Sequence, residues 1–182
     1  DNLAFSLTGW SAEKPATDMT QYCKAGEYFE LSFSMAYDGT DSEKFVDTFL
    51  VTSKVGSATR QKAAKTLLSI KDNTLSVWGE KINGVKLQPE KWYNFKFVFK
   101  AGTDRTYDFY IDDKLLISGA TVTTHLYGDS TNKTPIADLY GIYQLWFTNA
   151  LKASDGSEAS LKSGAKFTRK ELYIDDIAYK TY

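Results

Sequence analysis

The chain has 182 residues, a formal net charge of −1 and a high aromatic share of 15%. This length is enough for one domain with a substantial core, so we expect a single domain over residues 1–182. No basic cluster stands out, which argues against a nucleic-acid interface because phosphate binding needs grouped Lys and Arg. No apolar run approaches the roughly 20 residues of a membrane-spanning helix, so membrane insertion is not expected.

Cys23 is the only cysteine, which rules out an intrachain disulfide and a cysteine-based zinc site. The chain opens at Asp1 without the basic and apolar regions of a signal peptide. We therefore expect a mature or excised module, one part of a larger multimodular protein.

Short runs of alternating apolar and polar residues recur along the chain, and such alternation is typical of half-buried strands. They cover residues 3–7, 27–38, 45–53, 66–72, 74–81, 92–102, 106–119, 141–149 and 170–182. Asp72-Asn73 and Asp112-Asp113 each join two runs and predict tight hairpins. Many antiparallel strands without a long helix predict an all-β sandwich.

Three segments between these runs lack strand alternation. Residues 56–66 carry Ala and Lys at helical spacing, but the segment is too short to predict more than a helical turn or a loop. Residues 120–140 and 152–168 predict long polar loops, and long loops within a compact domain often carry function.

Three short motifs resemble one superfamily. They are WYNFKF from Trp92, FYIDDKL from Phe109 and the closing run LYIDDI from Leu172. Together they resemble the concanavalin A-like lectin/glucanase and laminin-G families, and the last motif resembles the closing strand of jelly-roll sugar-binding modules. The resemblance implies an antiparallel jelly roll of two curved sheets with long loops and little helix. It also implies carbohydrate as the commonest ligand, although fold alone does not establish function.

The polar face of several runs carries tryptophan beside small or hydrogen-bonding side chains. In residues 141–149, Tyr143, Leu145 and Phe147 are expected to face inward, whereas Gln144 and Trp146 face outward. In residues 74–81 the alternation places Trp78 outward, between Ser76 and Glu80. The same reasoning turns Glu30, Ser32, Ser34 and Lys71 outward.

An indole offers a rigid apolar surface on which a sugar ring can stack, while amide, hydroxyl and charged groups bind its hydroxyls. We therefore predict a polysaccharide site formed by Trp78, Trp146, Gln144, Ser76, Glu30, Ser32, Ser34 and Lys71. The alternative for either tryptophan is burial in the core or beneath one of the long loops.

Catalytic motifs are weak. Glycoside hydrolysis needs two carboxylates across one bond, and the strand signature E-x-D-x-x-E or E-x-D-x-E of glucanases on this fold is absent from the sequence. Asp108 with Asp112, and Glu171 with Asp175, are better explained as solvated or turn carboxylates. His125, the only histidine, could act with a tyrosine in a polysaccharide lyase, but the candidate partners are scattered: Tyr127, Arg60, Gln144 and Tyr110.

Two acidic turns offer oxygen ligands for a structural calcium ion. They contain Asp38 with Asp41 and Asp175 with Asp176. Jelly-roll carbohydrate-binding modules, which the chain resembles, often hold one such ion, but acidic turns also form without a metal. No other cofactor is expected.

The sequence as a whole predicts a non-catalytic carbohydrate-binding module of a secreted or cell-surface protein. It would direct an attached enzyme or cell to a polysaccharide, with avidity supplied by linked modules. Two alternatives stay open: a polysaccharide lyase or glycoside hydrolase on the same fold, and a protein-binding adhesin domain that uses the exposed aromatics and long loops.

Overall fold

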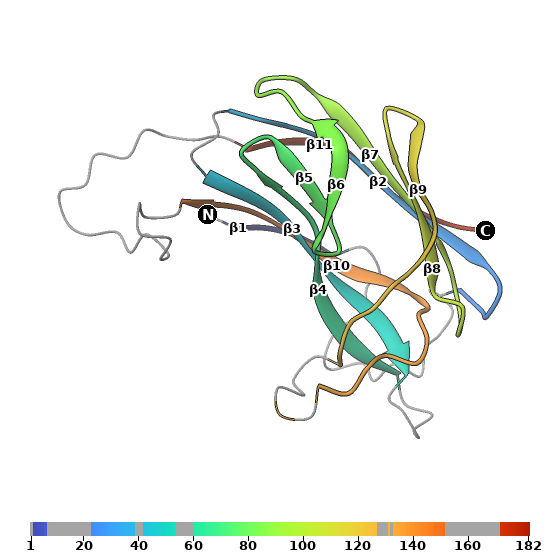
Figure 1. Ribbon diagram of the computed structural model, residues 1–182. Coiled ribbons are helices and arrows are strands. Elements are labelled where there is room, and N and C mark those ends of the chain that lie inside the picture. Colours follow the sequence, from blue (N-terminus) through green and yellow to red (C-terminus); the bar gives the residue numbers. More distant parts are fainter. Residues whose placement is uncertain are drawn as a thin grey trace.

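The computed structural model describes residues 2–6, 23–38, 42–53, 60–126, 131, 133–151 and 172–182. This part of the chain is all-β and forms two antiparallel sheets (Figure 1). Sheet A has the order β1-β10-β3-β4-β5-β6, and sheet B has the order β11-β2-β7-β8-β9. The predicted sandwich of jelly-roll type is therefore confirmed.

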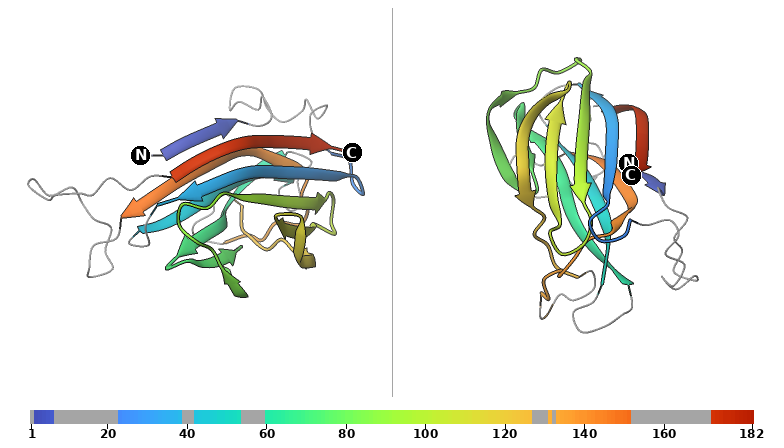
Figure 2. Two further views of the ribbon diagram at one scale, coloured as in Figure 1. Left: turned by 90° about the horizontal axis from the view of Figure 1, so that it is seen from above. Right: turned by 90° about the vertical axis from the view of Figure 1, so that its right-hand side faces the viewer.

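The strands range from 4 residues in β5 to 12 in β3 and β4, and the two sheets are visibly curved (Figure 2). Their bounds are β1 Asn2–Ser6, β2 Tyr28–Tyr37, β3 Ser42–Ser53, β4 Arg60–Lys71, β5 Thr74–Val77, β6 Glu80–Lys86, β7 Tyr93–Lys100, β8 Thr106–Ile111, β9 Lys114–Thr121, β10 Gly141–Leu151 and β11 Leu172–Thr181. The described residues contain no helix long and apolar enough to span a membrane.

The core lies between the sheets and is dominated by phenylalanine. Strand β7 alternates strictly, with Phe95, Phe97 and Phe99 fully buried and the residues between them partly exposed. Phe97 contacts Phe109 of β8 with ring centroids 4.6 Å apart. Because side chains alternate across a strand, the residues between these phenylalanines point to the outer face of sheet B.

Both predicted hairpins are confirmed. Asp72 and Asn73 join β4 to β5 with φ values of 49° and 60°, and Asp112 and Asp113 join β8 to β9 with φ values of 49° and 61°. Two consecutive positive φ angles are the signature of a type I′ turn, whose twist matches that of the paired strands.

The expected single strand over 74–81 is wrong. A two-residue turn at Trp78 and Gly79, with φ values of 52° and 84°, separates β5 from β6. The chain reverses there, and Val77 pairs with Glu80 across the turn. Gly79 adopts its positive φ without strain, whereas a bulky residue such as Trp78 needs packing to hold it there.

The helical turn expected within 56–66 is also wrong where the structure describes that segment. Strand β4 begins at Arg60, which pairs with Ser53 at the end of β3, and the pairing continues back along β3. Backbone pairing with a long neighbouring strand outweighs the weak helix propensity of Ala and Lys. The loop predicted over 152–168 lies outside the described residues.

The described part of the 120–140 segment is tied to the sandwich by isolated bridges. Leu126 pairs with Ala63 of β4, Leu139 pairs with Gly102, and His125 pairs with Pro135 within the segment. The segment is thus an ordered connection from β9 to β10 rather than a free loop over these residues.

Candidate functional site

The outer face of sheet A carries an aromatic cluster that begins on β10. Gln144 and Trp146 are partly exposed, whereas Leu145 and Phe147 between and beyond them are buried in the core. The ring of Trp146 lies 5.2 Å from that of Phe49 on the neighbouring strand β3. The outward direction that the sequence alternation predicts for Gln144 and Trp146 is therefore confirmed.

A β-bulge on β10 adds a tyrosine to this cluster. The register shifts between Ile142 and Gln144, so Tyr143 is the extra residue. Such a bulge lets two consecutive residues leave the strict alternation. Tyr143 packs with Val51 and Phe49 on the outer face, with 5.6 Å between the Phe49 and Tyr143 ring centroids. The expected inward direction of Tyr143 is therefore wrong.

The indole nitrogen of Trp146 is a buried donor. Trp146 is partly exposed as a residue, but its Nε1 is shielded and finds no hydrogen-bond acceptor in the described protein. A buried polar group without a partner costs about 1–3 kcal/mol. Because Nε1 is covered by protein, a sugar could contact Trp146 only through the exposed part of its ring.

A polar hollow of about 270 Å³ lies on the same face, across β4, β5 and β6. Its lining consists of Ser69, Lys71, Asp72, Thr74, Ser76 and Lys81. Ser69 of the hollow pairs with Phe45 of β3, which pairs with Thr148 of β10, two residues beyond Trp146. Trp146 itself pairs with Asp47, which accepts a 2.6 Å hydrogen bond from Thr66. At about 4.8 Å between neighbouring strands, the surface from β10 to β5 extends about 14 Å.

Four predicted ligand residues share this face: Trp146 and Gln144 on β10, Lys71 on β4 and Ser76 on β5. The other three polar residues, Glu30, Ser32 and Ser34, lie on β2 in sheet B. Their side chains alternate with the buried Phe29, Leu31 and Phe33, so they face outward on the opposite side of the sandwich. The prediction that all of them form one site is therefore wrong.

Trp78 is not a surface platform. It is 5% exposed and belongs to the core, where its ring lies 5.9 Å from that of Tyr107 and 6.4 Å from that of Phe99. The reversal of the chain at Trp78-Gly79 removes it from the alternation of β5 and turns it inward. The prediction of an outward Trp78 is wrong for this reason.

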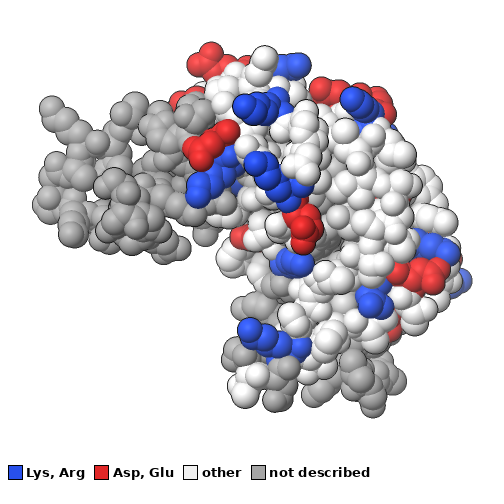
Figure 3. Space-filling model, in the orientation of Figure 1, with Lys and Arg blue, Asp and Glu red and all other residues white. Residues whose placement is uncertain are grey.

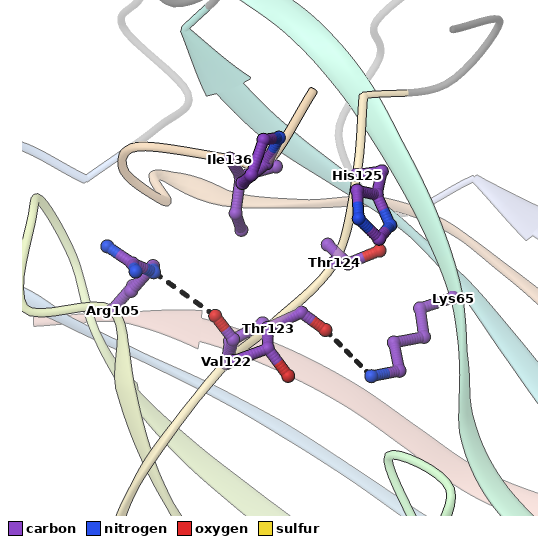
Figure 4. Close-up of a pocket in the computed structure, with 8 residues that line it drawn as sticks. Lys65, Arg105, Val122, Thr123, Thr124, His125 and Ile136 are labelled. Atoms are coloured by element: carbon purple, nitrogen blue, oxygen red, sulfur yellow. Dashed lines mark hydrogen bonds between the residues drawn. The ribbon is translucent and has the colours of Figure 1, made fainter. Parts of the chain in front are cut away.

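A second depression, of about 560 Å³, lies beside the 122–136 segment (Figure 4). Its lining includes three basic side chains, Lys65, Arg105 and His125, and no carboxylate. Figure 4 shows Lys65 and Arg105 on opposite sides of the 122–124 backbone, each bonded to it. Lys65 Nζ donates to the Thr123 carbonyl over 2.7 Å, and Arg105 Nε donates to the Val122 carbonyl over 3.2 Å.

These bonds give the two cations a structural role. Arg105 Nη1 also donates to the Ala137 carbonyl over 3.1 Å, so one guanidinium holds both limbs of the connection. Burial lowers the pKa of Lys65, as expected for an ammonium group partly removed from water.

The scattered lyase candidates do not assemble in the described structure. His125 is an exposed residue of the depression, Gln144 lies on sheet A, and Tyr110 lies on β8 in sheet B. Tyr127 and the side chain of Arg60 lie outside the described residues. Asp108 accepts a bond from the backbone N–H of Gly119, and Asp112 accepts one from the backbone N–H of Asn94. Both carboxylates therefore stabilise turns and strand ends.

The predicted calcium ligands are not brought together either. Asp38 follows β2, whereas Asp175 pairs with Ser34, four residues earlier on that strand. Four residues of a strand span about 13 Å, too far for one ion. Asp175 instead accepts a 2.8 Å bond from the Asp176 amide, and Asp41 lies outside the described residues. The described part contains no group of three metal-ligating side chains.

Charged side chains of both signs are interspersed over the face shown in Figure 3. No large patch of one sign dominates the described surface in this view, which agrees with the near-neutral net charge. Recognition by this face would therefore rest on local groups rather than on a long-range field.

Two solved structures share this fold over nearly the whole chain. An alginate lyase in complex with an alginate trisaccharide superposes with a TM-score of 0.50 at 8% identity, covering 100% of this chain and 81% of that one. An endo-β-1,4-glucuronan lyase from the fungus Trichoderma reesei superposes with a TM-score of 0.50 at 10% identity, covering 98% of this chain and 79% of that one. At such low identity the likeness shows the jelly-roll fold. No protein-family model and no curated protein matches the sequence.

Proposed function

We propose that the chain binds a polysaccharide along the outer face of sheet A. The observation that carries the proposal is Trp146, a partly exposed indole on the same face of sheet A as a polar hollow. The exposed part of its ring can stack against the apolar face of a sugar. The surface of about 14 Å from β10 to β5 accommodates more than one sugar unit.

The hollow favours an acidic polysaccharide. Lys71 and Lys81 contribute two ammonium groups, against the single carboxylate of Asp72. Serine and threonine hydroxyls line the remainder and can donate or accept with sugar hydroxyls. The two superposed lyases act on alginate and glucuronan, both of which are polymers of uronic acids. This supports a uronate chain as the ligand class.

In this role the chain is a non-catalytic module that holds an attached enzyme or cell near its substrate. Such a module is secreted or displayed at the cell surface, because polysaccharides of this kind are extracellular. A single shallow site binds weakly, and linkage to further modules supplies avidity.

Trp146→Ala is expected to weaken polysaccharide binding by about 2 kcal/mol, roughly thirtyfold, as for a central aromatic contact. Affinity electrophoresis in gels containing alginate or glucuronan measures this, and a glycan array extends the search to other polymers. Tyr182→Ala is the matched control, because Tyr182 is 61% exposed and lies beside Glu30 on the outer face of sheet B. Undiminished binding by folded Trp146→Ala would contradict the proposed face.

A polysaccharide lyase is the second candidate, favoured by the activity of both superposed proteins. Elimination from a uronate requires a group that neutralises the carboxyl, a base for the adjacent proton and an acid for the leaving oxygen. On the described outer face of sheet A, the Gln144 amide suits the first role, whereas Lys71 lies at the other end of the face. The Tyr140 hydroxyl, which donates to Asp138 over 3.2 Å, lies near the aromatic cluster and suits proton transfer.

A lyase leaves a carbon–carbon double bond at the new non-reducing end, which absorbs in the ultraviolet. If the chain is a binding module, incubation with alginate or glucuronan produces no such absorbance while binding persists. A steady rise in absorbance that Tyr140→Phe abolishes would establish the lyase instead, and retained binding by that variant would show that its fold is intact.

A further inference from the structure

The outer face of sheet B carries a pair of exposed aromatic rings far from Trp146. Trp92 is 49% exposed and Tyr173 is 44% exposed, and their ring centroids lie 6.5 Å apart. Trp92 precedes β7, in which the next residue, Tyr93, is buried, and Tyr173 belongs to β11. Large apolar side chains are uncommon at such exposure, and two in contact form a surface that invites a partner.

The strand between the two rings explains their arrangement. Ala36 of β2 pairs with Tyr173, and Met35 next to it pairs with Tyr93. Ala36 therefore lies between Trp92 and Tyr173 on the outer face, and although it faces outward it is only 2% exposed. The two flanking rings account for the low exposure of this small residue.

Hydrogen-bonding groups continue from this pair along the strands. Two residues further on the same face are Asn94 on β7 and Ser34 on β2, which pair with each other across the strands. Asn94 Nδ2 donates to Ser34 Oγ over 3.5 Å, a long bond that leaves amide capacity for a ligand. An aromatic surface followed by an amide and a hydroxyl has the composition of a sugar site.

The charges around the pair differ from those of the sheet A hollow. Asp175 pairs with Ser34, and Asp112 accepts a bond from the backbone N–H of Asn94, so carboxylates adjoin the polar end. Among the described residues, Lys96 on the same face pairs with Asp113 at 2.8 Å, and Lys91, next to Trp92, has its Nζ 5.0 Å from the Tyr93 ring centroid. The described carboxylates disfavour a uronate here, whereas they do not act against an uncharged sugar.

We propose that Trp92 and Tyr173, with Asn94 and Ser34, form a second sugar-binding surface that takes a neutral glycan. The proposal extends the proposed polysaccharide binding, because it places a second and chemically different site on the opposite face of the sandwich. With one site on each face, a single molecule can bridge two polysaccharide chains, one acidic and one neutral.

Isothermal titration calorimetry with two probes separates the two sites. The probes are an alginate oligosaccharide and a cello-oligosaccharide, titrated into the full chain and into the variants Trp92→Ala/Tyr173→Ala and Trp146→Ala. We expect the first variant to weaken cello-oligosaccharide binding at least about tenfold and to leave alginate binding unchanged. Trp146→Ala is expected to do the reverse.

Each failure has a distinct signature. Cello-oligosaccharide affinity that is unchanged in folded Trp92→Ala/Tyr173→Ala overturns the second site, whatever Trp146→Ala does. Loss of both probes in Trp146→Ala alone also overturns it and leaves sheet A as the glycan face. If Trp146→Ala changes neither affinity but the double variant loses the neutral probe, the proposed function of sheet A fails and the sheet B site stands. Binding of neither probe by the wild type overturns both proposed sites. The variant Asn94→Ala tests the polar end of the sheet B site without disturbing the two rings.

Discussion

Trp78→Ala is expected to lower the free energy of unfolding by about 3–5 kcal/mol, the usual cost of removing a large buried aromatic side chain. The ring is 5% exposed and packs against Tyr107 and Phe99 of sheet B, so its loss opens a cavity between the sheets. It also removes the packing that holds a positive φ at the turn. Equilibrium urea unfolding followed by circular dichroism measures the difference.

Trp146→Ala is the matched comparison, because it removes the same side chain from a partly exposed position. We expect it to destabilise the fold by clearly less than Trp78→Ala does, and Trp78→Phe should recover part of the loss. Equal, small effects for the two alanine variants would contradict the inward placement of Trp78 and would restore it as a candidate surface residue.

Alkaline pH is expected to destabilise the fold through two buried tyrosines. Burial raises the pKa of Tyr37 to about 12 and that of Tyr107 to about 12, from an ordinary value of 10.0. Between about pH 10 and pH 12 the unfolded chain loses both phenolic protons while the folded chain keeps them. Stability therefore stays constant below pH 10 on their account and falls by at most about 1.4 kcal/mol per pH unit for each tyrosine above it.

Urea midpoints measured across this alkaline range test the effect. Tyr107→Phe should reduce the slope of stability against pH, because phenylalanine has no proton to lose. Tyr37→Phe should do the same but also lower stability at neutral pH, since the Tyr37 hydroxyl donates to Asn73 over 3.0 Å. The buried Cys23 thiol, whose pKa burial raises to about 11, contributes in the same direction and is removed in a Cys23→Ala background. An unchanged slope in both Phe variants would contradict the assignment.

Much of the fold could be predicted because strand alternation and turn chemistry are local. The alternation in β7 and β2 predicts which residues are buried, and this prediction needs no knowledge of the partner strands. The hairpins at Asp72-Asn73 and Asp112-Asp113 follow from residues that tolerate positive φ. For the same reason the outward direction of Trp146 and Gln144 could be predicted from the sequence.

The candidate site could be predicted only in part, because alternation gives the face of a residue but not the sheet to which its strand belongs. Ser32 and Ser76 both face outward, yet β2 and β5 lie in opposite sheets. The exposed pair of Trp92 and Tyr173 escaped sequence reasoning because the two residues are far apart in the chain and meet only through β2.

The sequence by itself determined that this protein is a β-sandwich, where most of its strands and two of its hairpins lie, and which stripe is apolar in strands such as β2 and β7. Only the tertiary structure decided the strand order, the bulge at Tyr143 and the turn at Trp78. A single extra residue or a two-residue reversal exchanges the faces of everything beyond it. Those two local events turned Tyr143 out and Trp78 in, and they leave Trp146 as the indole of sheet A that faces outward in the described part of the chain.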